Sequence, residues 1–172
     1  MSKYVITGGP GFEKTTIIES LGTNKFYIGE EIARKLIKEV KARNGHELPN
    51  KDRLAFETLL LEKKIKDYSA SKDKDAFFDR GLCDAIGFFN YDGITPLEAC
   101  IESCNNYRYD KIFLVPPWEE IYVQDNERPY TFQESSEIHE KIKEAYIEFG
   151  YNPIEVPRMS VKKRVEFVLR NI

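Results

Sequence analysis

Nine residues near the amino terminus have the types and spacing of a phosphate-binding loop. The stretch follows an apolar run at residues 4–6 and precedes apolar residues spaced for one helix face. The first amides of a helix lack internal partners and lie at the positive end of its dipole, and glycines let neighbouring N–H groups surround an anion. Lys14 would then reach the outer phosphates of a nucleotide, and the Thr15 hydroxyl would bind Mg2+. The predicted loop residues are Gly8, Gly9, Pro10, Gly11, Phe12, Glu13, Lys14, Thr15 and Thr16.

Position 13 departs from the G-x-x-x-x-G-K-[ST] pattern of such loops, because Glu13 stands where the second glycine is expected. A carboxylate about 5 Å from a phosphate, at an effective dielectric constant near 20, would cost roughly 3 kcal/mol per unit charge if it pointed inward. We therefore expect Glu13 either to face solvent or to weaken binding, with a negative φ that leaves its amide free to donate. On this hypothesis, Glu13→Gly raises the affinity for ATP.

Two adjacent residues could complete a site for Mg2+ and phosphate. Asp79 ends the apolar run at residues 76–78, where a carboxylate can hold Mg2+ directly or through water. Its alternative role is to cap the helix that follows. Arg80 could neutralise charge on a phosphoryl acceptor or product, or be an ordinary surface arginine. In the first interpretation, Asp79 is a catalytic metal ligand and Arg80 contacts substrate.

Acids and an arginine also follow a second predicted strand. Glu30 and Glu31 lie where a carboxylate could accept a hydroxyl proton as a general base, and Glu31 is the predicted catalytic residue. Acids are equally favourable in the first turn of any helix, which is the alternative interpretation. Arg34 lies one helical turn after Glu30 and could pair with it or contact substrate.

A polar segment at about residues 119–131 is suited to a lid. Arg128 within it could close over the transferring phosphate and stabilise the charge that develops there. The alternative is a solvated loop. Trp118, which follows two prolines, could stack on a base or wall a substrate pocket, or cap the core instead.

Strands that alternate with helices position these residues. Strands are predicted at residues 4–6, 24–28, 76–78, 111–115 and 153–156. This alternation predicts an α/β fold in which a mostly parallel sheet has helices on both faces. Ligands of such sheets bind beyond the carboxyl ends of the strands, so the polar clusters should converge on one edge. We predict a single domain over residues 1–172, because no linker divides the chain.

Several details of the helices can also be predicted. Thr131 and Glu134 have the spacing of a capping box, and Ser160 can cap the last helix. Apolar spacing places Leu54 on the buried face of a helix at about residues 51–69, and Leu169 on the buried face of the last helix.

Composition narrows the partners and the location. A net charge of −3 and an isoelectric point near 5.6 provide no general basic surface for nucleic acid. The sequence has no signal peptide and no apolar stretch long enough to span a bilayer, so we predict a cytoplasmic protein without a membrane partner. The three cysteines, Cys83, Cys100 and Cys104, are predicted to be reduced and buried.

Five short motifs together resemble a known family. They are Gly-Gly-Pro-Gly-Phe-x-Lys-Thr at 8–15, Glu-x-x-Arg at 31–34, Asp-Arg-Gly at 79–81, Pro-Pro-Trp at 116–118 and Asp-x-x-Arg at 125–128. This order resembles the compact bacterial AAA-domain group of predicted ATPases among the P-loop NTPases, which is similar to nicotinamide riboside, deoxynucleoside and thymidylate kinases. The resemblance implies a five-stranded parallel sheet in which the strands before Gly8 and Arg80 are neighbours. It also implies that Glu31 acts as base and Arg128 closes on phosphate.

Three functions fit these observations. The first is an ATP- and Mg2+-dependent kinase for a small nucleoside- or nucleotide-like acceptor, whose pocket would be built from about residues 45–75 and 82–105. The second is an ATPase or GTPase switch that acts on a protein partner. The third is a degenerate P-loop protein in which Glu13 has removed catalysis. A monomer or small homo-oligomer is expected, because 172 residues without a second arginine motif do not favour a hexameric motor.

Overall fold

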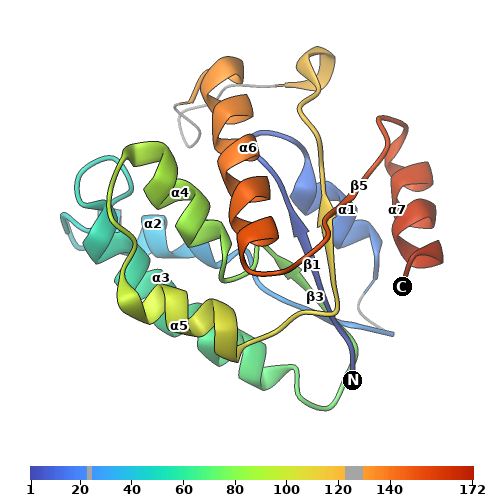
Figure 1. Cartoon of the computed structure of the whole chain (residues 1–172), viewed down its shortest axis with the longest axis horizontal. Coiled ribbons are helices and arrows are strands. Elements are labelled where there is room, and N and C mark those ends of the chain that lie inside the picture. Colours follow the sequence, from blue (N-terminus) through green and yellow to red (C-terminus); the bar gives the residue numbers. More distant parts are fainter. Residues whose placement is uncertain (23–24, 123–129) are drawn as a thin grey trace.

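The computed structural model describes residues 1–22, 25–122 and 130–172. Its centre is a five-stranded sheet in the order β2-β3-β1-β4-β5, and the paired strands run parallel (Figure 1). The strands are β1 (Lys3–Thr7), β2 (Tyr27–Ile28), β3 (Ala76–Asp79), β4 (Lys111–Leu114) and β5 (Ile154–Glu155). The predicted α/β fold with a parallel sheet is therefore confirmed. The implied neighbourhood of β1 and β3 is confirmed too, because Ile6 pairs with Asp79.

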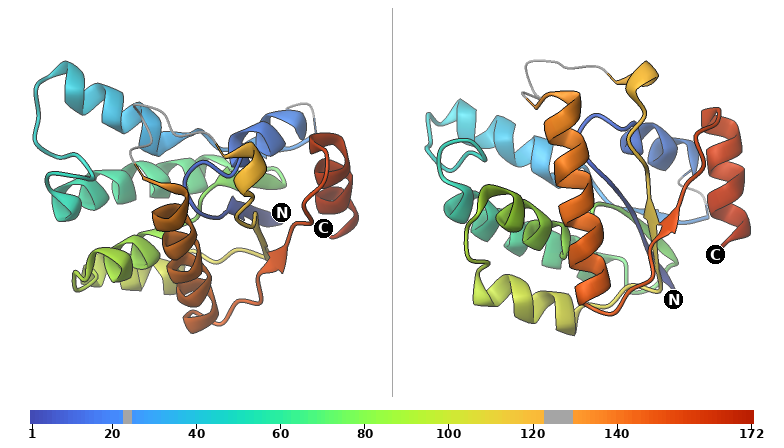
Figure 2. Two further views of the ribbon diagram at one scale, coloured as in Figure 1. Left: turned by 90° about the horizontal axis from the view of Figure 1, so that it is seen from above. Right: turned by 45° about the horizontal axis from the view of Figure 1, so that its top comes forward.

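Helices cover both faces of the sheet. They are α1 (Lys14–Ser20), α2 (Ile32–Ala42), α3 (Arg53–Ala70), α4 (Asp84–Asp92), α5 (Glu98–Asn106), the short 3-10 turn η1 (Glu119–Ile121), α6 (Phe132–Glu148) and α7 (Val161–Arg170). Both views in Figure 2 keep α1 and α7 together on one side and α3 to α6 on the other. The result is the expected arrangement of three layers.

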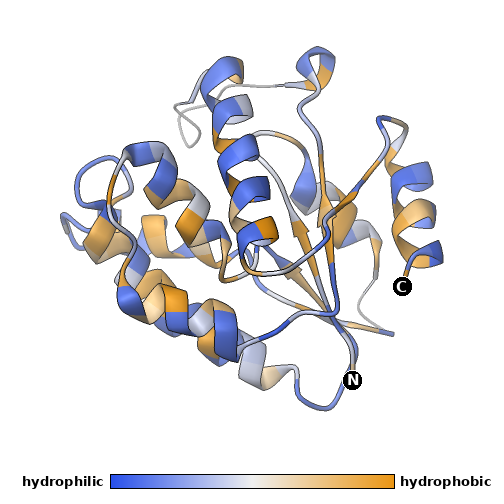
Figure 3. Ribbon diagram, in the orientation of Figure 1, coloured by the Kyte–Doolittle hydropathy of each residue, from blue (hydrophilic) through white to orange (hydrophobic). Residues whose placement is uncertain are grey.

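The alternation of side chains along the strands explains why both faces are covered. Val5 belongs to the apolar cluster beneath α4, α5 and α6, whereas Tyr4 and Ile6 belong to the cluster beneath α1 and α7. Neighbouring strand residues point to opposite faces, so a strand that is apolar throughout must be buried on both sides. Figure 3 shows this apolar character along the central strands, with hydrophilic residues on the outward surfaces of the helices.

Two predictions about helix faces and one about a cap are wrong. Leu54 and Leu169 are 42% and 39% exposed, because each lies at the edge of its helix's apolar stripe, where its side chain faces water. Ser160 is the N-cap residue of α7, but its side chain accepts no capping hydrogen bond. The predicted capping box is confirmed, since Thr131 and Glu134 bond reciprocally at the start of α6. Of the strand predicted at residues 24–28, the structure shows Tyr27–Ile28 as β2, and residue 24 lies outside the described residues.

The remaining global predictions concern thiols, membranes and the lid. Cys83, Cys100 and Cys104 are free and buried, as predicted. Among the helices that the structure describes, none combines the length and the apolar character of a bilayer span. The predicted lid includes residues 123–129, so Asp125 and Arg128 lie outside the described residues.

Candidate phosphate and acceptor site

Glycine is required at two points of the loop between β1 and α1. Gly8 has a φ of 140°, and a β-carbon there would lie 2.4 Å from the carbonyl oxygen of Val115. Gly11 has a φ of 80°, and its β-carbon would lie 2.5 Å from the ring of Tyr122. Residues that carry a side chain rarely adopt such φ values, and a side chain at either position would collide with these neighbours. The loop can therefore follow this tight path only because both residues lack a side chain.

Asp79, at the end of β3, lies beside Lys14 and Thr15 at the start of α1. The Lys14 ammonium is buried and donates to the carbonyl oxygen of Gly9 at 2.6 Å. The Thr15 hydroxyl donates to the Asp79 carboxylate at 3.1 Å, because β1 and β3 are neighbours and both end at this edge. The structure thus brings Lys14, Thr15 and Asp79 together at the amino-terminal end of α1, at the edge of the sheet where the sequence analysis expected the polar clusters to converge.

The chemistry of these oxygens fits Mg2+. Magnesium prefers oxygen ligands and is commonly held by one or two protein groups while phosphates and water complete its octahedron. Thr15 and Asp79 offer a hydroxyl and a carboxylate 3.1 Å apart, directly beside the loop. These two residues would hold the ion, which would neutralise phosphate charge.

Glu13 adopts a backbone conformation that glycine tolerates more easily than other residues do. Its φ and ψ are 53° and 31°, in the left-handed region, so the expected negative φ is wrong. A residue with a side chain pays roughly 1–3 kcal/mol for this region. The carboxylate accepts a hydrogen bond at 2.7 Å from the guanidinium of Arg164, a residue of α7 that is 3% exposed. The sequence alone does not show that Arg164 is buried, since it follows two lysines, and only the packing of α7 on α1 reveals it.

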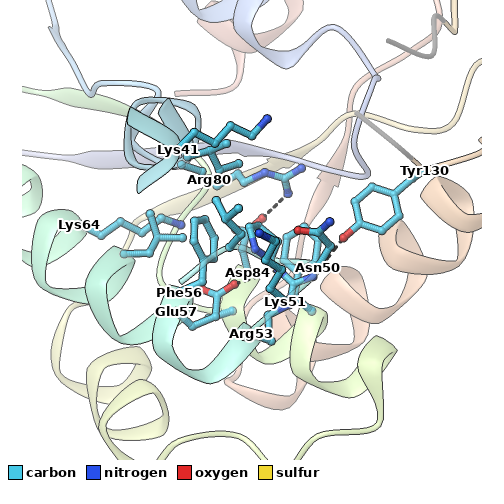
Figure 4. A pocket seen from close by; sticks show the side chains of 17 residues that line it. Lys41, Asn50, Lys51, Arg53, Phe56, Glu57, Lys64, Arg80, Asp84 and Tyr130 are labelled. Carbon is cyan, nitrogen blue, oxygen red and sulfur yellow. Dashed lines mark hydrogen bonds and ion pairs between the residues drawn. The ribbon is translucent and has the colours of Figure 1, made fainter. Parts of the chain in front are cut away.

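Two cavities open side by side at this edge of the sheet. The smaller, about 220 Å³, is the phosphate cavity, whose lining includes the loop from Pro10 to Thr15, together with Glu31, Arg34, Asp79 and Arg80. The larger, about 450 Å³, lies between α2, α3 and α4, and we name it the acceptor cavity after the role that the sequence analysis predicts for these segments (Figure 4). The two linings share Ala33, Ile37, Lys41, Lys64 and Arg80. The two cavities therefore adjoin one another along these five residues.

A buried polar network lies in the acceptor cavity, and motif analysis missed it. The Arg53 guanidinium donates to Asp92 at 2.7 Å and to the Tyr130 hydroxyl at 3.0 Å, and lies 4.9 Å from the Phe88 ring centre. The Glu57 carboxylate lies 3.5 Å from the Arg53 guanidinium, which makes this a long and weak contact. Burial therefore raises the pKa of Glu57, despite the nearby charges of Lys64 and Arg53. Sequence analysis identified the segments but not the residues, because Arg53 and Glu57 resemble an ordinary helical ion pair.

Arg80 is held by a buried carboxylate that the sequence did not single out. Asp84 accepts hydrogen bonds from Arg80 at 2.8 Å, from the Gly81 amide at 2.9 Å and from the Tyr146 hydroxyl at 2.7 Å. The Thr7 hydroxyl also donates to it. Burial alone would raise the pKa of Asp84, but Arg80 and these hydrogen bonds outweigh it, so the pKa lies below its ordinary value. The Arg80 guanidinium is thereby directed over the junction of the two cavities (Figure 4).

The other predicted site residues separate into two groups. Glu31 and Arg34 pair at 3.3 Å and line the phosphate cavity, so Arg34 pairs with Glu31 rather than with Glu30. Glu30 instead pairs with Lys35 at 2.8 Å and lines a different depression.

Two residues lie near the loop without lining either cavity. Thr16 is exposed on α1. Trp118 covers Arg164, whose guanidinium lies 5.8 Å from the tryptophan ring centre.

Comparison with known proteins now identifies the class. Residues 3–164 match the AAA domain family, and because this match takes in most of the chain, the protein belongs to that family. Its fold is also found in solved structures of nucleoside and nucleotide kinases. No curated protein sequence matches the chain.

Solved structures with this fold include three kinds of protein. Deoxyadenosine kinase from M. mycoides, with the products dCMP and dCDP, has a TM-score of 0.71 at 15% identity over 98% of this chain and 97% of that one. Thymidylate kinase from Ehrlichia chaffeensis has a TM-score of 0.68 at 12% identity over 99% and 97%. NadR protein in complex with NR has a TM-score of 0.64 at 16% identity, over 98% of this chain but 49% of NadR. The TM-scores show a shared fold, and at identities this low the likeness shows the fold alone.

Proposed function

We propose that the protein is a small-molecule kinase that transfers the terminal phosphoryl group of ATP, with Mg2+, to a hydroxyl of a nucleoside- or nucleotide-like acceptor. The observation that carries this proposal is the shared wall of the two cavities, formed by Ala33, Ile37, Lys41, Lys64 and Arg80. A hydrolytic switch needs room only for water beside the phosphate. Here a second cavity of about 450 Å³ adjoins the phosphate cavity, within the size range of small-molecule sites.

The proposed roles follow from position. Lys14 and the loop amides bind phosphates, and Thr15 and Asp79 hold the metal. Glu31 lines the phosphate cavity, where its carboxylate is suited to accept the proton of the acceptor hydroxyl. Arg80 contributes positive charge at the junction of the cavities. Arg128, outside the described residues, is proposed to close on the transferring phosphate.

The lining of the acceptor cavity supports a flat, partly polar acceptor. Phe56 and Phe88 supply aromatic surface, and Arg53, Glu57 and Tyr130 supply donors and acceptors in its wall. Such a mixture suits a ring that carries both apolar faces and polar edges. The nucleotides in the M. mycoides kinase and the NR in NadR are molecules of this kind, which supports testing them first.

A panel of nucleosides, nucleotides and nicotinamide riboside, each incubated with ATP and Mg2+, tests the proposal. We expect one acceptor to give a phosphorylated product whose rate depends on Lys14. Matched reactions with Lys14→Ala should give no product. Hydrolysis of ATP or GTP that no acceptor changes and a protein partner stimulates would favour a switch instead. Binding without turnover would favour the degenerate P-loop protein.

A further inference from the structure

Three features are energetically unfavourable where α7 meets the phosphate-binding loop. Glu13 is a non-glycine residue with a φ of 53°. Arg164 carries a buried charge, and it lies in the first turn of α7, where the helix dipole disfavours a cation. Each feature alone would destabilise the protein. Exceptions of this kind are expected at sites that serve function rather than stability.

One contact relates all three exceptions. The Arg164 guanidinium donates to the Glu13 carboxylate at 2.7 Å, and these residues are 151 positions apart in the chain. The pair gives the buried Arg164 cation an anionic partner and links the side chain of Glu13, the residue with the positive φ, to α7. It also replaces an isolated negative charge beside the phosphate cavity by a neutral pair, whose field falls off faster with distance.

The surroundings of Arg164 make it a rigid support. Its guanidinium lies 5.8 Å from the Trp118 ring centre, and its backbone amide donates to Ser160 at 3.0 Å within α7. The Nε atom of Arg164 is buried without a hydrogen-bond partner among the described residues. The 2.7 Å hydrogen bond from the guanidinium to Glu13 therefore offsets much of the free-energy cost of burying this side chain. Helix α7 itself packs on α1, the helix that begins at Lys14.

We propose that Arg164 is a positioning residue of the phosphate-binding loop: it holds the Glu13 carboxylate away from bound phosphate and fixes the left-handed backbone turn at Glu13, a conformation that glycine adopts at little cost. The inference deepens the proposed function, since it rests on nucleotide binding at this loop. Arg164 acts through Glu13 and does not itself contact the reacting atoms.

Four variants test the proposal, with MgATP affinity measured by calorimetry. Arg164→Met should weaken binding at least tenfold, because it frees the carboxylate and the turn. Glu13→Gly should bind at least as tightly as the wild type. The double variant Glu13→Gly/Arg164→Met should regain wild-type affinity within threefold, because glycine needs no support. Lys163→Met removes the same charge from an exposed position of α7 and should change the affinity less than twofold.

Rescue by Glu13→Gly separates positioning from simple loss of core packing. If Arg164→Met binds as the wild type does, or if the double variant is as weak as Arg164→Met alone, the proposal is overturned. If Arg164→Met does not fold, the MgATP affinity of the double variant still tests the proposal, because removing both charges leaves no unpaired buried ion. A double variant that fails to fold as well would contradict the proposal.

A second measurement keeps this inference distinct from the proposed function. If the wild type binds no nucleotide, the kinase proposal fails, and a double-mutant cycle on the free energy of unfolding decides the role of Arg164. Strong coupling between residues 13 and 164 would support it. Additive effects of the two substitutions would contradict it.

Discussion

At the scale of single residues, the loop shows how a side chain in a glycine position can be accommodated. Glu13 has a φ of 53° and a partner in Arg164 at 2.7 Å, so the backbone keeps its path and the carboxylate has a cation beside it. Nearby, Thr15 and Asp79 offer a hydroxyl and a carboxylate oxygen 3.1 Å apart, and oxygen atoms are the ligands that Mg2+ prefers. The departure at position 13 is therefore local to one side chain.

Thr15 provides a direct test of the metal site. We expect Thr15→Val to lower kcat of the proposed transfer at least about a hundredfold, because a metal ion supplies several kcal/mol of charge stabilisation. Thr15→Ser keeps the hydroxyl and should retain most of the rate. Steady-state rates over a Mg2+ titration provide the measurement. Equal rates for the valine and serine variants would show that the hydroxyl does not hold the ion.

His139 should make stability depend on pH. Burial, followed by the charge of Lys14, lowers its pKa to about 4, whereas an unfolded histidine titrates near 6.5. Between about pH 6.5 and pH 4 the unfolded state binds a proton that the folded state does not, so stability falls as the pH falls. The slope from this residue is at most about 1.4 kcal/mol per pH unit.

Urea unfolding over this pH range measures that slope. His139→Gln should flatten it, while His46→Gln, at an exposed position, should leave it unchanged. An NMR titration that gives His139 an ordinary pKa would contradict the prediction.

At the scale of elements, helix α3 connects local sequence to the acceptor cavity. It begins at a cap, since the Asp52 carboxylate accepts from the Ala55 amide at 3.0 Å. Arg53, Phe56 and Glu57 follow in its first two turns and all line the cavity. The start of the helix therefore sets the position of the residues that would touch an acceptor.

Two helix caps allow a matched comparison. Asp52→Ala should lower the free energy of unfolding by about 1 kcal/mol, because it leaves an amide of α3 without its acceptor. Ser160 is the N-cap residue of α7 without a capping bond, so Ser160→Ala should have almost no effect. Thermal unfolding of both variants provides the measurement, and equal losses would contradict the contrast.

At the scale of the whole molecule, Asp84 joins four parts of the fold. Its carboxylate accepts from Thr7 on β1, from Arg80 and Gly81 after β3, and from Tyr146 on α6, while Asp84 itself begins α4. Helices α4 and α6 pack so closely that a β-carbon on Gly87 would lie 2.6 Å from the Cα of Ile142. Sheet, helices and the Arg80 junction are thus held by one buried group.

Asp84→Asn should lower the free energy of unfolding by about 3 kcal/mol, because Arg80 loses its counter-charge and the new amide faces donors. Tyr146→Phe removes one donor and should cost about 1–3 kcal/mol. The lowered pKa of Asp84 means that its contribution is complete above the ordinary aspartate range and is lost as the pH falls through the lower folded value. Denaturant unfolding at neutral and acidic pH measures both effects. A wild-type-like Asp84→Asn would contradict this role.

The sequence by itself determined what depends on neighbours along the chain. The apolar periods predicted the strands and helices, and the order of glycines, Lys14 and Thr15 predicted the loop. The rule that parallel strands end at one edge correctly placed Asp79 beside Thr15. Short motifs and apolar spacing predict these features because the hydrogen bonds of helices and the groups at helix ends involve residues that are close together in the sequence.

Only the tertiary structure decided which distant side chains meet. The partner of Glu13 comes from 151 positions away, and the burial of Arg164 depends on how α7 packs on α1. Arg53 and Glu57 resemble a surface ion pair until α3, α4 and Tyr130 enclose them. Such pairings depend on how the elements pack. Burial, rather than spacing along the chain, sets the free energy of a charged side chain, and no local sequence pattern shows whether that side chain is buried.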